Sequence, residues 1–308
     1  MASSTGEIAL SLLDRFGFRP LETLRIVAPL GIRFWDPARG VPVTDGLTVT
    51  VRPEGSRRPG RAAARTLSGI YAVHHFPGLR AMEYPSDDVA LGSPLQARPF
   101  VVEVVDNQRR FLPATLRVVA PWPGVFPVAD VTREPHGFHL FSAPTRPTTL
   151  ALAAVRALLE ERVDAVTRRP AAHAVLAVQV QGLPAVQPTW HGVADAEGSV
   201  AVLFPYPTFT GSAPTGSPLL APPADRRQRW RVSITVLSSP PALHVPEGSR
   251  QPDLGSIFGQ AQTVVWPSLI GGTAPVAEYQ AELVFGEELV LRTGENSALV
   301  IGPGGSPP

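Results

Sequence analysis

The histidines are the first residues to consider for chemistry, because imidazole titrates near neutral pH and is a common metal ligand. His136 and His139 stand three residues apart in the sequence HGFH, a spacing that would place both on one side of a helix. The proline and glycine beside them favour a turn instead, and no acidic cluster adjoins them. His74 and His75 are adjacent, and adjacent residues of a strand point to opposite faces, so we expect one packed and one exposed. We therefore expect neither pair to bind a metal.

The sequence TWHGVADAEG, residues 189–198, holds the best local arrangement for acid–base catalysis. His191, Asp195 and Glu197 stand close together in it. An aspartate followed by a glycine also has a structural use, because the aspartate bonds nearby backbone N–H groups and glycine accepts a positive φ. We favour this second interpretation, in which Asp195 and Gly198 shape a turn.

No other catalytic arrangement stands out in the sequence. There is no cysteine, which excludes disulfides, thiolate nucleophiles and cysteine-bound metals. The sequence also lacks a GxSxG nucleophile elbow, a phosphate-binding loop, a dinucleotide fingerprint and a calcium loop. We therefore expect a protein that is not an enzyme and that needs no cofactor.

Aromatic and basic residues in proline-rich or loop-like stretches are the candidates for contact with another protein. Trp122 and Trp266 stand among prolines, in PWPG and VVWPS, and buried aromatic rings often carry the energy of an interface. The densest basic cluster is RRQRWR, residues 226–231; we expect it to face an acidic partner, although Trp230 would also allow stacking on a nucleic-acid base. The candidate interface residues are Trp122, Trp266, Arg226, Arg227, Arg229 and Phe258.

Short alternating apolar stretches separated by prolines predict an all-β protein. The chain has 35 prolines, which suit strand ends and turns but interrupt helices and central strands. Alternation such as TVTV and RVSITV is typical of strands with one buried face. Trp35, Trp190 and Trp230 lie in or beside such stretches, and we expect them to pack in the core. The predicted strands are 24–36, 46–52, 69–76, 100–106, 111–119, 174–180, 198–204 and 229–237.

Two parts of the chain align when one is shifted by 128 residues. The shift brings Asp36 onto Asp164, Pro42 onto Pro170 and the run LTVTV onto VLAVQ. A repeat of this length indicates a duplicated domain of about 100 residues rather than a solenoid. The segment 150–166 is rich in helix-forming residues, but its counterpart in the repeat favours a strand, so we expect extended structure there while a short helix stays open.

The repeat and the loops predict five regions. These are an N-terminal segment 1–19, a first β-sandwich 20–125, a linker 126–145, a second β-sandwich 146–245 and a C-terminal arm 246–308. In the arm, Gly286 and Glu287 separate two apolar runs, which predicts a hairpin, and a flexible tail follows. We expect the arm to pack on the second sandwich or to add strands to a partner's sheet.

The charge balance favours protein partners. Charged residues are 17% of the chain, against about 25% in typical proteins, so much of the surface is weakly charged or covered in an assembly. The net charge of +1 argues against a nucleic-acid partner. The N-terminus lacks the pattern of a secretion signal, and no apolar run approaches the roughly 20 residues of a membrane span. We expect a multimeric protein of the cytoplasm with no membrane insertion and no signal peptide.

The repeated segments resemble the prealbumin-like sandwich of the carboxypeptidase regulatory-like domain. DPARGVPVTDGLTVTV and GVADAEGSVAVLFPYP carry the resemblance, the second through Asp195, Gly198 and Phe204-Pro205. The first copy departs from the pattern, since RTLSGIYAVHHFPG has no turn aspartate. The resemblance implies tandem prealbumin-like or immunoglobulin-like sandwiches that serve binding or assembly, and it implies no chemistry.

The chain as a whole also resembles accessory proteins of phage-tail-like contractile injection systems, in stretches such as FVVEVVDNQRRFLP and PDLGSIFGQ. This resemblance implies a noncatalytic structural subunit, at the cap or the baseplate, that contacts other subunits through loops and the C-terminal arm. The alternative is a freestanding module that binds a ligand or carbohydrate. It predicts a concave aromatic cluster that includes Trp122 or Trp190.

Overall fold

The computed structural model shows an all-β protein, as the sequence predicts. Its helical elements in the described part are the 3-10 turn Pro240–Ala242 and the short helix α3, Leu254–Phe258. Neither is long and apolar enough to cross a membrane. The structure describes residues 28–75, 98–120, 137–164, 167–181, 188–207, 228–270 and 273–302.

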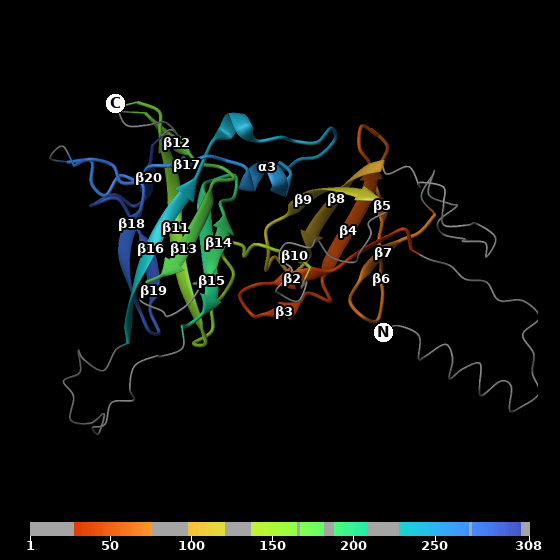
Figure 1. Cartoon of the computed structure of the whole chain (residues 1–308), viewed down its shortest axis with the longest axis horizontal. Helices are drawn as coiled ribbons and strands as arrows, with labels where there is room; N and C mark the ends of the chain where they lie inside the picture. The colour runs from red at the N-terminus through yellow and green to blue at the C-terminus, as the bar shows by residue number, and fades with distance from the viewer. Residues whose placement is uncertain are drawn as a thin grey trace, which may run out of the picture.

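The first half of the chain is a β-sandwich (Figure 1). One layer is a four-stranded antiparallel sheet in the order β5-β4-β8-β9, and the other consists of two three-stranded sheets, β1-β7-β6 and β10-β2-β3. Side chains of both layers meet in one core that includes Phe34, Val51 and Phe100. The strands are β1 (Leu30–Ile32), β2 (Phe34–Asp36), β3 (Val41–Pro42), β4 (Leu47–Pro53), β5 (Arg61–Ala62), β6 (Ala64–Arg65), β7 (Tyr71–Val73), β8 (Arg98–Asp106), β9 (Ala114–Ala120) and β10 (Phe138–His139).

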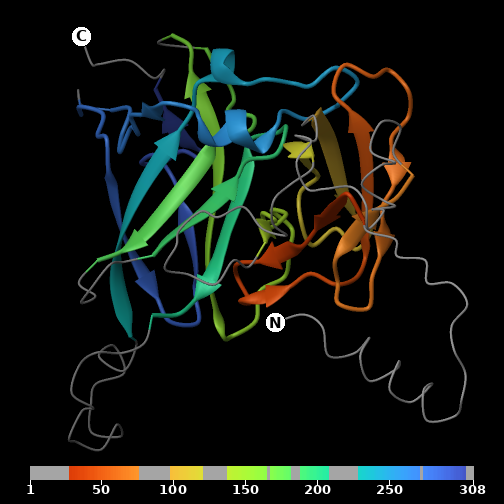
Figure 2. The ribbon, with the colours of Figure 1, turned by 45° about the vertical axis from the view of Figure 1, so that its right-hand side comes forward.

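The second half is a larger sandwich beside the first (Figure 2). One sheet has the order β14-β13-β16-β17, with β18 also paired to β16, and the other has the order β12-β11-β15, with β19 and β20 also paired to β11. Leu159, Leu176, Phe204 and Ile234 are fully buried between them. The strands are β11 (Leu152–Arg162), β12 (Arg168–Pro170), β13 (Val175–Val180), β14 (Thr189–Val193), β15 (Ser199–Pro205), β16 (Arg229–Leu237), β17 (Gln262–Thr263), β18 (Tyr279–Val284), β19 (Glu288–Leu291) and β20 (Leu299–Ile301).

Corresponding strands pair in the same way in the two halves. Shifted by 128 residues, β4, β7 and β8 overlap β13, β15 and β16. β4 pairs antiparallel with β8 as β13 does with β16, and β1 pairs antiparallel with β7 as β11 does with β15. The shared pairing supports a duplicated sandwich.

The segment with high helix propensity forms β11, so the expectation of extended structure is confirmed. Ala153, Val155, Ala157 and Leu159 alternate along the strand and are buried in the second core. β11 pairs with β12, β15, β19 and β20, and these partners satisfy its backbone groups along its length. Burial and strand pairing therefore outweigh the intrinsic preference of alanine and leucine for helix.

The predicted hairpin at Gly286 is wrong, although its turn is present. Gly286 has a φ of 77°, which suits the turn residue expected there. The flanking strands do not pair with each other: β18 joins β16 in one sheet and β19 joins β11 in the opposite sheet. Leu283, Leu291, Leu299 and Ile301 lie in the second core. The C-terminal strands therefore pack on the second sandwich, which is one of the two outcomes expected for the arm.

A buried ion pair fastens the residues before β11 to the first sandwich. Arg146 donates to both carboxylate oxygens of Asp36, with Nη2–Oδ2 at 2.5 Å and Nη1–Oδ1 at 3.2 Å. The guanidinium also stacks over the ring of Phe111, 4.7 Å from its centroid. From the second sandwich, Arg156 donates to the carbonyl of Arg146 at 2.8 Å and pairs with Glu288. The chain of contacts links both sandwiches.

A second set of contacts joins the loop before α3 to the first sandwich. Buried Arg52 on β4 donates to the carbonyl of Glu247 at 2.5 Å and to Ser249 Oγ at 2.6 Å. Asp253 caps α3 by accepting from the backbone N–H of Ser256, and it forms a parallel bridge with Thr115 on β9. Figures 1 and 2 place α3 at the junction of the two sandwiches.

Candidate functional site

Two hollows lie at the junction of the sandwiches. The larger, which we name the aromatic cleft, has a volume of about 390 Å³. Both sandwiches and α3 contribute to its wall. It is lined by Trp35, Pro37, His139, Phe141, Pro188, Thr189, Trp190, His191, Leu203 and Phe258.

β14 places two ring side chains in the aromatic cleft. β14 is the edge strand of its sheet, and consecutive residues of a strand point to opposite faces, so Trp190 and His191 reach the cleft from the two sides of this edge. The indole of Trp190 stacks on buried Phe204, with centroids 4.4 Å apart and planes 19° from parallel. The predicted packing of Trp190 is confirmed, and the same ring also lines the cleft.

The first sandwich and α3 supply the other walls. Trp35 is on β2, and β10, which pairs parallel with β2, carries His139 opposite it. Phe258 ends α3; its ring lies 5.2 Å from that of Phe141 and 5.6 Å from that of His191, the latter edge to face. These rings come from segments far apart in the sequence, so the cleft exists only because the sandwiches are held together.

The lining of the aromatic cleft has no acidic side chain and no lysine or arginine among its ten residues. His191 is exposed along part of its ring, yet burial against its neighbours lowers the pKa of its imidazole. The imidazole is therefore neutral at pH 7 and offers one donor and one acceptor.

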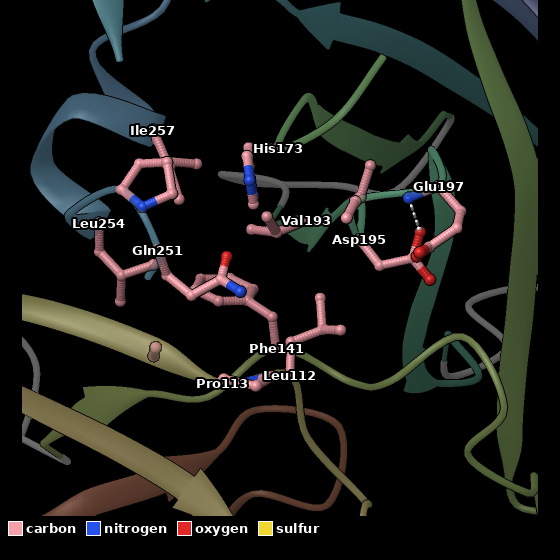
Figure 3. Close-up of a pocket in the computed structure, with 14 residues that line it drawn as sticks. Leu112, Pro113, Phe141, His173, Val193, Asp195, Glu197, Gln251, Leu254 and Ile257 are labelled. Carbon is pink, nitrogen blue, oxygen red and sulfur yellow. Dashed lines mark hydrogen bonds between the residues drawn. The ribbon is translucent and has the colours of Figure 1, made fainter. Parts of the chain in front are cut away.

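The smaller hollow, the junction cavity, has a volume of about 180 Å³ (Figure 3). Leu254 and Ile257 of α3 form one wall, and the turn at Asp195 and Glu197 forms the opposite wall. Phe141 lines both hollows. His173 and Gln251 are further polar residues of this cavity.

His173 is the titratable residue that sequence reasoning missed. It takes a φ of 61°, which is uncommon for a residue other than glycine. Burial lowers the pKa of its imidazole, and the nearby carboxylate of Asp195 opposes part of this effect. The side chain of Gln260, which follows α3, donates to the backbone carbonyl of His173 at 2.8 Å. This hydrogen bond holds the backbone of His173 in position. No local motif marks this histidine in the sequence.

Asp195 has the turn role expected from the sequence. Its Oδ1 accepts from the backbone N–H groups of Glu197 at 3.1 Å and Ser199 at 2.8 Å. Gly198 takes a φ of 84°, and a Cβ there would lie 2.4 Å from the carbonyl oxygen of Leu159. His191 lines the aromatic cleft while Asp195 and Glu197 line the junction cavity. The acid–base arrangement is therefore not assembled.

The candidate interface residues fall in different places. Trp122, Arg226 and Arg227 lie outside the described residues, and Phe258 lines the aromatic cleft. Arg229 on β16 pairs with Glu282 on β18 at 3.0 Å, so its acidic partner in this structure belongs to the same chain. Trp266 is half-buried, with the guanidinium of Arg162 4.6 Å from its ring centroid. Of the three that the structure describes, Phe258 is the one that lines the aromatic cleft.

The structure describes three of the four paired histidines. His136 lies outside the described residues, and His139 is on a strand rather than a helix. His75 is exposed and has a φ of 60°, while His74 is half-buried with its Nδ1 shielded from solvent. Within the described ranges, no three histidine or acidic side chains are grouped closely enough to hold a metal.

Comparison with known proteins gives no family for this chain. No protein-family model matches it, and no curated protein matches it. Among solved structures, a C-terminal fragment of the pilus adhesin SpaC from Lactobacillus rhamnosus GG aligns at 9% identity over 89% of this chain and 96% of the fragment. The TM-score is 0.18, which is too low to bear on fold or function.

Proposed function

We propose that this chain is a noncatalytic structural subunit of a phage-tail-like contractile injection particle, at its cap or baseplate. The observation that carries the proposal is the buried Asp36–Arg146 pair with the contacts that continue from it into the second sandwich. A subunit that holds its partners a fixed distance apart, or transmits force from one to another, needs domains that keep a constant relative position. The contacts of the Asp36–Arg146 pair provide this. The tandem prealbumin-like pattern of the sequence points to the same class of protein.

The apolar contacts across the junction add to this support. Ala38 of the first sandwich is buried against Ala154 and Leu203 of the second. Phe141, before β11, is buried in another cluster with Val175 and Ile257. Buried apolar surface of this kind holds domains together without directional bonds. Two sandwiches joined in this way act as one rigid spacer.

Loops and exposed apolar side chains are the surfaces that this proposal assigns to partners. Leu150 and Ile270 are 79% and 77% exposed. Phe285 is also exposed, and its ring contacts Tyr206, whose centroid is 4.7 Å away. Single exposed apolar residues are common, but aromatic and aliphatic residues at loop ends suit protein contacts in an assembly. In this proposal, assembly proceeds through these loops.

The test is the composition of the native particle. The particle is purified from the source cells without a tag, and its subunits are quantified by mass spectrometry against the sheath protein. The proposal expects this chain in a fixed ratio in every intact preparation. An Arg146→Ala variant should enter particles less well than Arg229→Ala, which removes an exposed ion pair. Absence of the wild-type chain from intact particles would reject the proposal.

A further inference from the structure

We propose that the aromatic cleft is a binding site for a neutral saccharide. This inference does not depend on particle assembly, because it rests on the walls of one cleft within a single chain. The volume of about 390 Å³ lies in the range of small-molecule sites, about 300–1,000 Å³. The lining combines aromatic rings with a few polar groups, as such sites do.

The rings suit the C–H faces of a sugar ring. A pyranose presents apolar C–H groups on its faces and hydroxyl groups at its edge, so it stacks on an aromatic ring while its edge stays polar. Trp190 is held by its stack on Phe204, and Trp35 reaches the same cleft from the other sandwich. Rings that are fixed before binding lose little conformational entropy when the ligand arrives.

The polar groups suit the hydroxyl edge. His139, Thr189 and His191 are exposed and line the cleft. Hydroxyl groups both donate and accept, and the neutral imidazole of His191 and the hydroxyl of Thr189 do the same. A wholly apolar ligand would remove these groups from water without giving them new bonds, which costs free energy.

The lining selects against ionic ligands because it lacks aspartate, glutamate, lysine and arginine. A phosphate, a carboxylate or an ammonium group would find none of these partners among the ten lining residues and would lose part of its hydration. A proline-rich peptide also stacks on aromatic rings, but it binds along an extended groove. The cleft instead lies at the junction of the two sandwiches, where residues of β2, β14 and α3 line it, and this compact shape favours a ligand of a few rings.

The experiment measures binding of the full chain to a panel of neutral tetrasaccharides of glucose, galactose, mannose and N-acetylglucosamine by isothermal titration calorimetry. A sialylated tetrasaccharide and a proline-rich decapeptide serve as the charged and peptide probes. His191→Ala and Phe258→Ala test the cleft, since both side chains are partly exposed. His244→Ala and Phe285→Ala are matched controls, because both residues are exposed and neither lines the cleft.

We expect at least one neutral tetrasaccharide to bind, and each cleft variant to weaken that binding about tenfold or more, as loss of a central contact does. The control variants should bind as the wild type does. Urea unfolding of all four variants separates loss of the site from loss of the fold. The proposal is overturned if no neutral saccharide binds at millimolar concentration, if the cleft variants bind normally, or if the charged or peptide probe binds better.

Discussion

Asp36 and Arg146 form an ion pair in which both side chains are more than nine-tenths buried and the closest N–O distance is 2.5 Å. Asp36 also accepts from the backbone N–H of Ala38, and Arg146 donates to Ser142 Oγ. The pair joins β2 to the residues that lead into β11. In the repeat, the equivalent Asp164 is exposed and accepts from the backbone N–H of Thr167 within its own turn. The first copy of this aspartate thus joins the two sandwiches, while the second shapes a local turn.

Arg146→Ala should lower the free energy of unfolding by about 3–5 kcal/mol, because it leaves the carboxylate of Asp36 buried without its partner. Arg229→Ala is the matched control, and it should cost less than about 1 kcal/mol because its pair with Glu282 is exposed. The double variant Asp36→Leu/Arg146→Met should recover part of the loss by replacing the pair with apolar packing. Urea unfolding measures all three, and equal costs for both single variants would contradict the role given to the pair.

Gly198→Ala should destabilise the protein more than Gly286→Ala does. Both glycines have positive φ, so both substitutions strain the backbone by about 1–2 kcal/mol. A Cβ at residue 198 would also lie 2.4 Å from the carbonyl oxygen of Leu159, whereas a Cβ at residue 286 meets nothing within 4 Å. Thermal unfolding of the two variants measures the difference. A similar loss of thermal stability in both variants would mean that β11, which carries Leu159, can move away from the turn at little cost in free energy.

Local sequence patterns predict strands well where one face is buried. The alternation in RWRVSITVL gives the bounds of β16, Arg229–Leu237, because Val232, Ile234 and Val236 all reach the core. For β11 the local pattern is ambiguous, and the repeat resolves it. The apolar runs around Gly286 show that a turn is present but not which strands pair, since that depends on sheets built from distant residues.

The candidate site is much harder to predict from the sequence. Of the predicted interface residues, Phe258 lines the aromatic cleft. The sequence predicts Trp35 and Trp190 to be packing residues. That both also line the aromatic cleft depends on the contact between the two sandwiches, which brings β2 and β14 to the same cleft. No local spacing relates residues that lie in separate sandwiches. The available signal in the sequence is the presence of aromatic residues in predicted strands of both halves, such as Trp35 and Trp190.

A chain that ends at Phe285 should lose the second sandwich. The truncation removes β19 and β20, and with them the buried side chains of Leu291, Leu299 and Ile301. It also leaves β11 without its two parallel partners. A chain that ends at Gly302 is the control. Near-ultraviolet circular dichroism and proteolysis should show loss of the packed second core in the first chain alone, and a packed core in both would mean that these strands are an appendage.

Acidification should destabilise the protein through His173. Burial lowers the pKa of this imidazole below the value of about 6.5 that it has in the unfolded chain. As the pH falls through that value, the unfolded chain takes up the proton more readily than the folded chain, so the stability contributed by the neutral imidazole is complete above it and declines below it. His173→Asn keeps a residue that tolerates positive φ and removes the titration. Unfolding in urea at pH 7.5 and 5.5 should show a smaller loss for this variant than for the wild type and for the exposed control His244→Asn. An unchanged loss would assign the pH dependence to other groups.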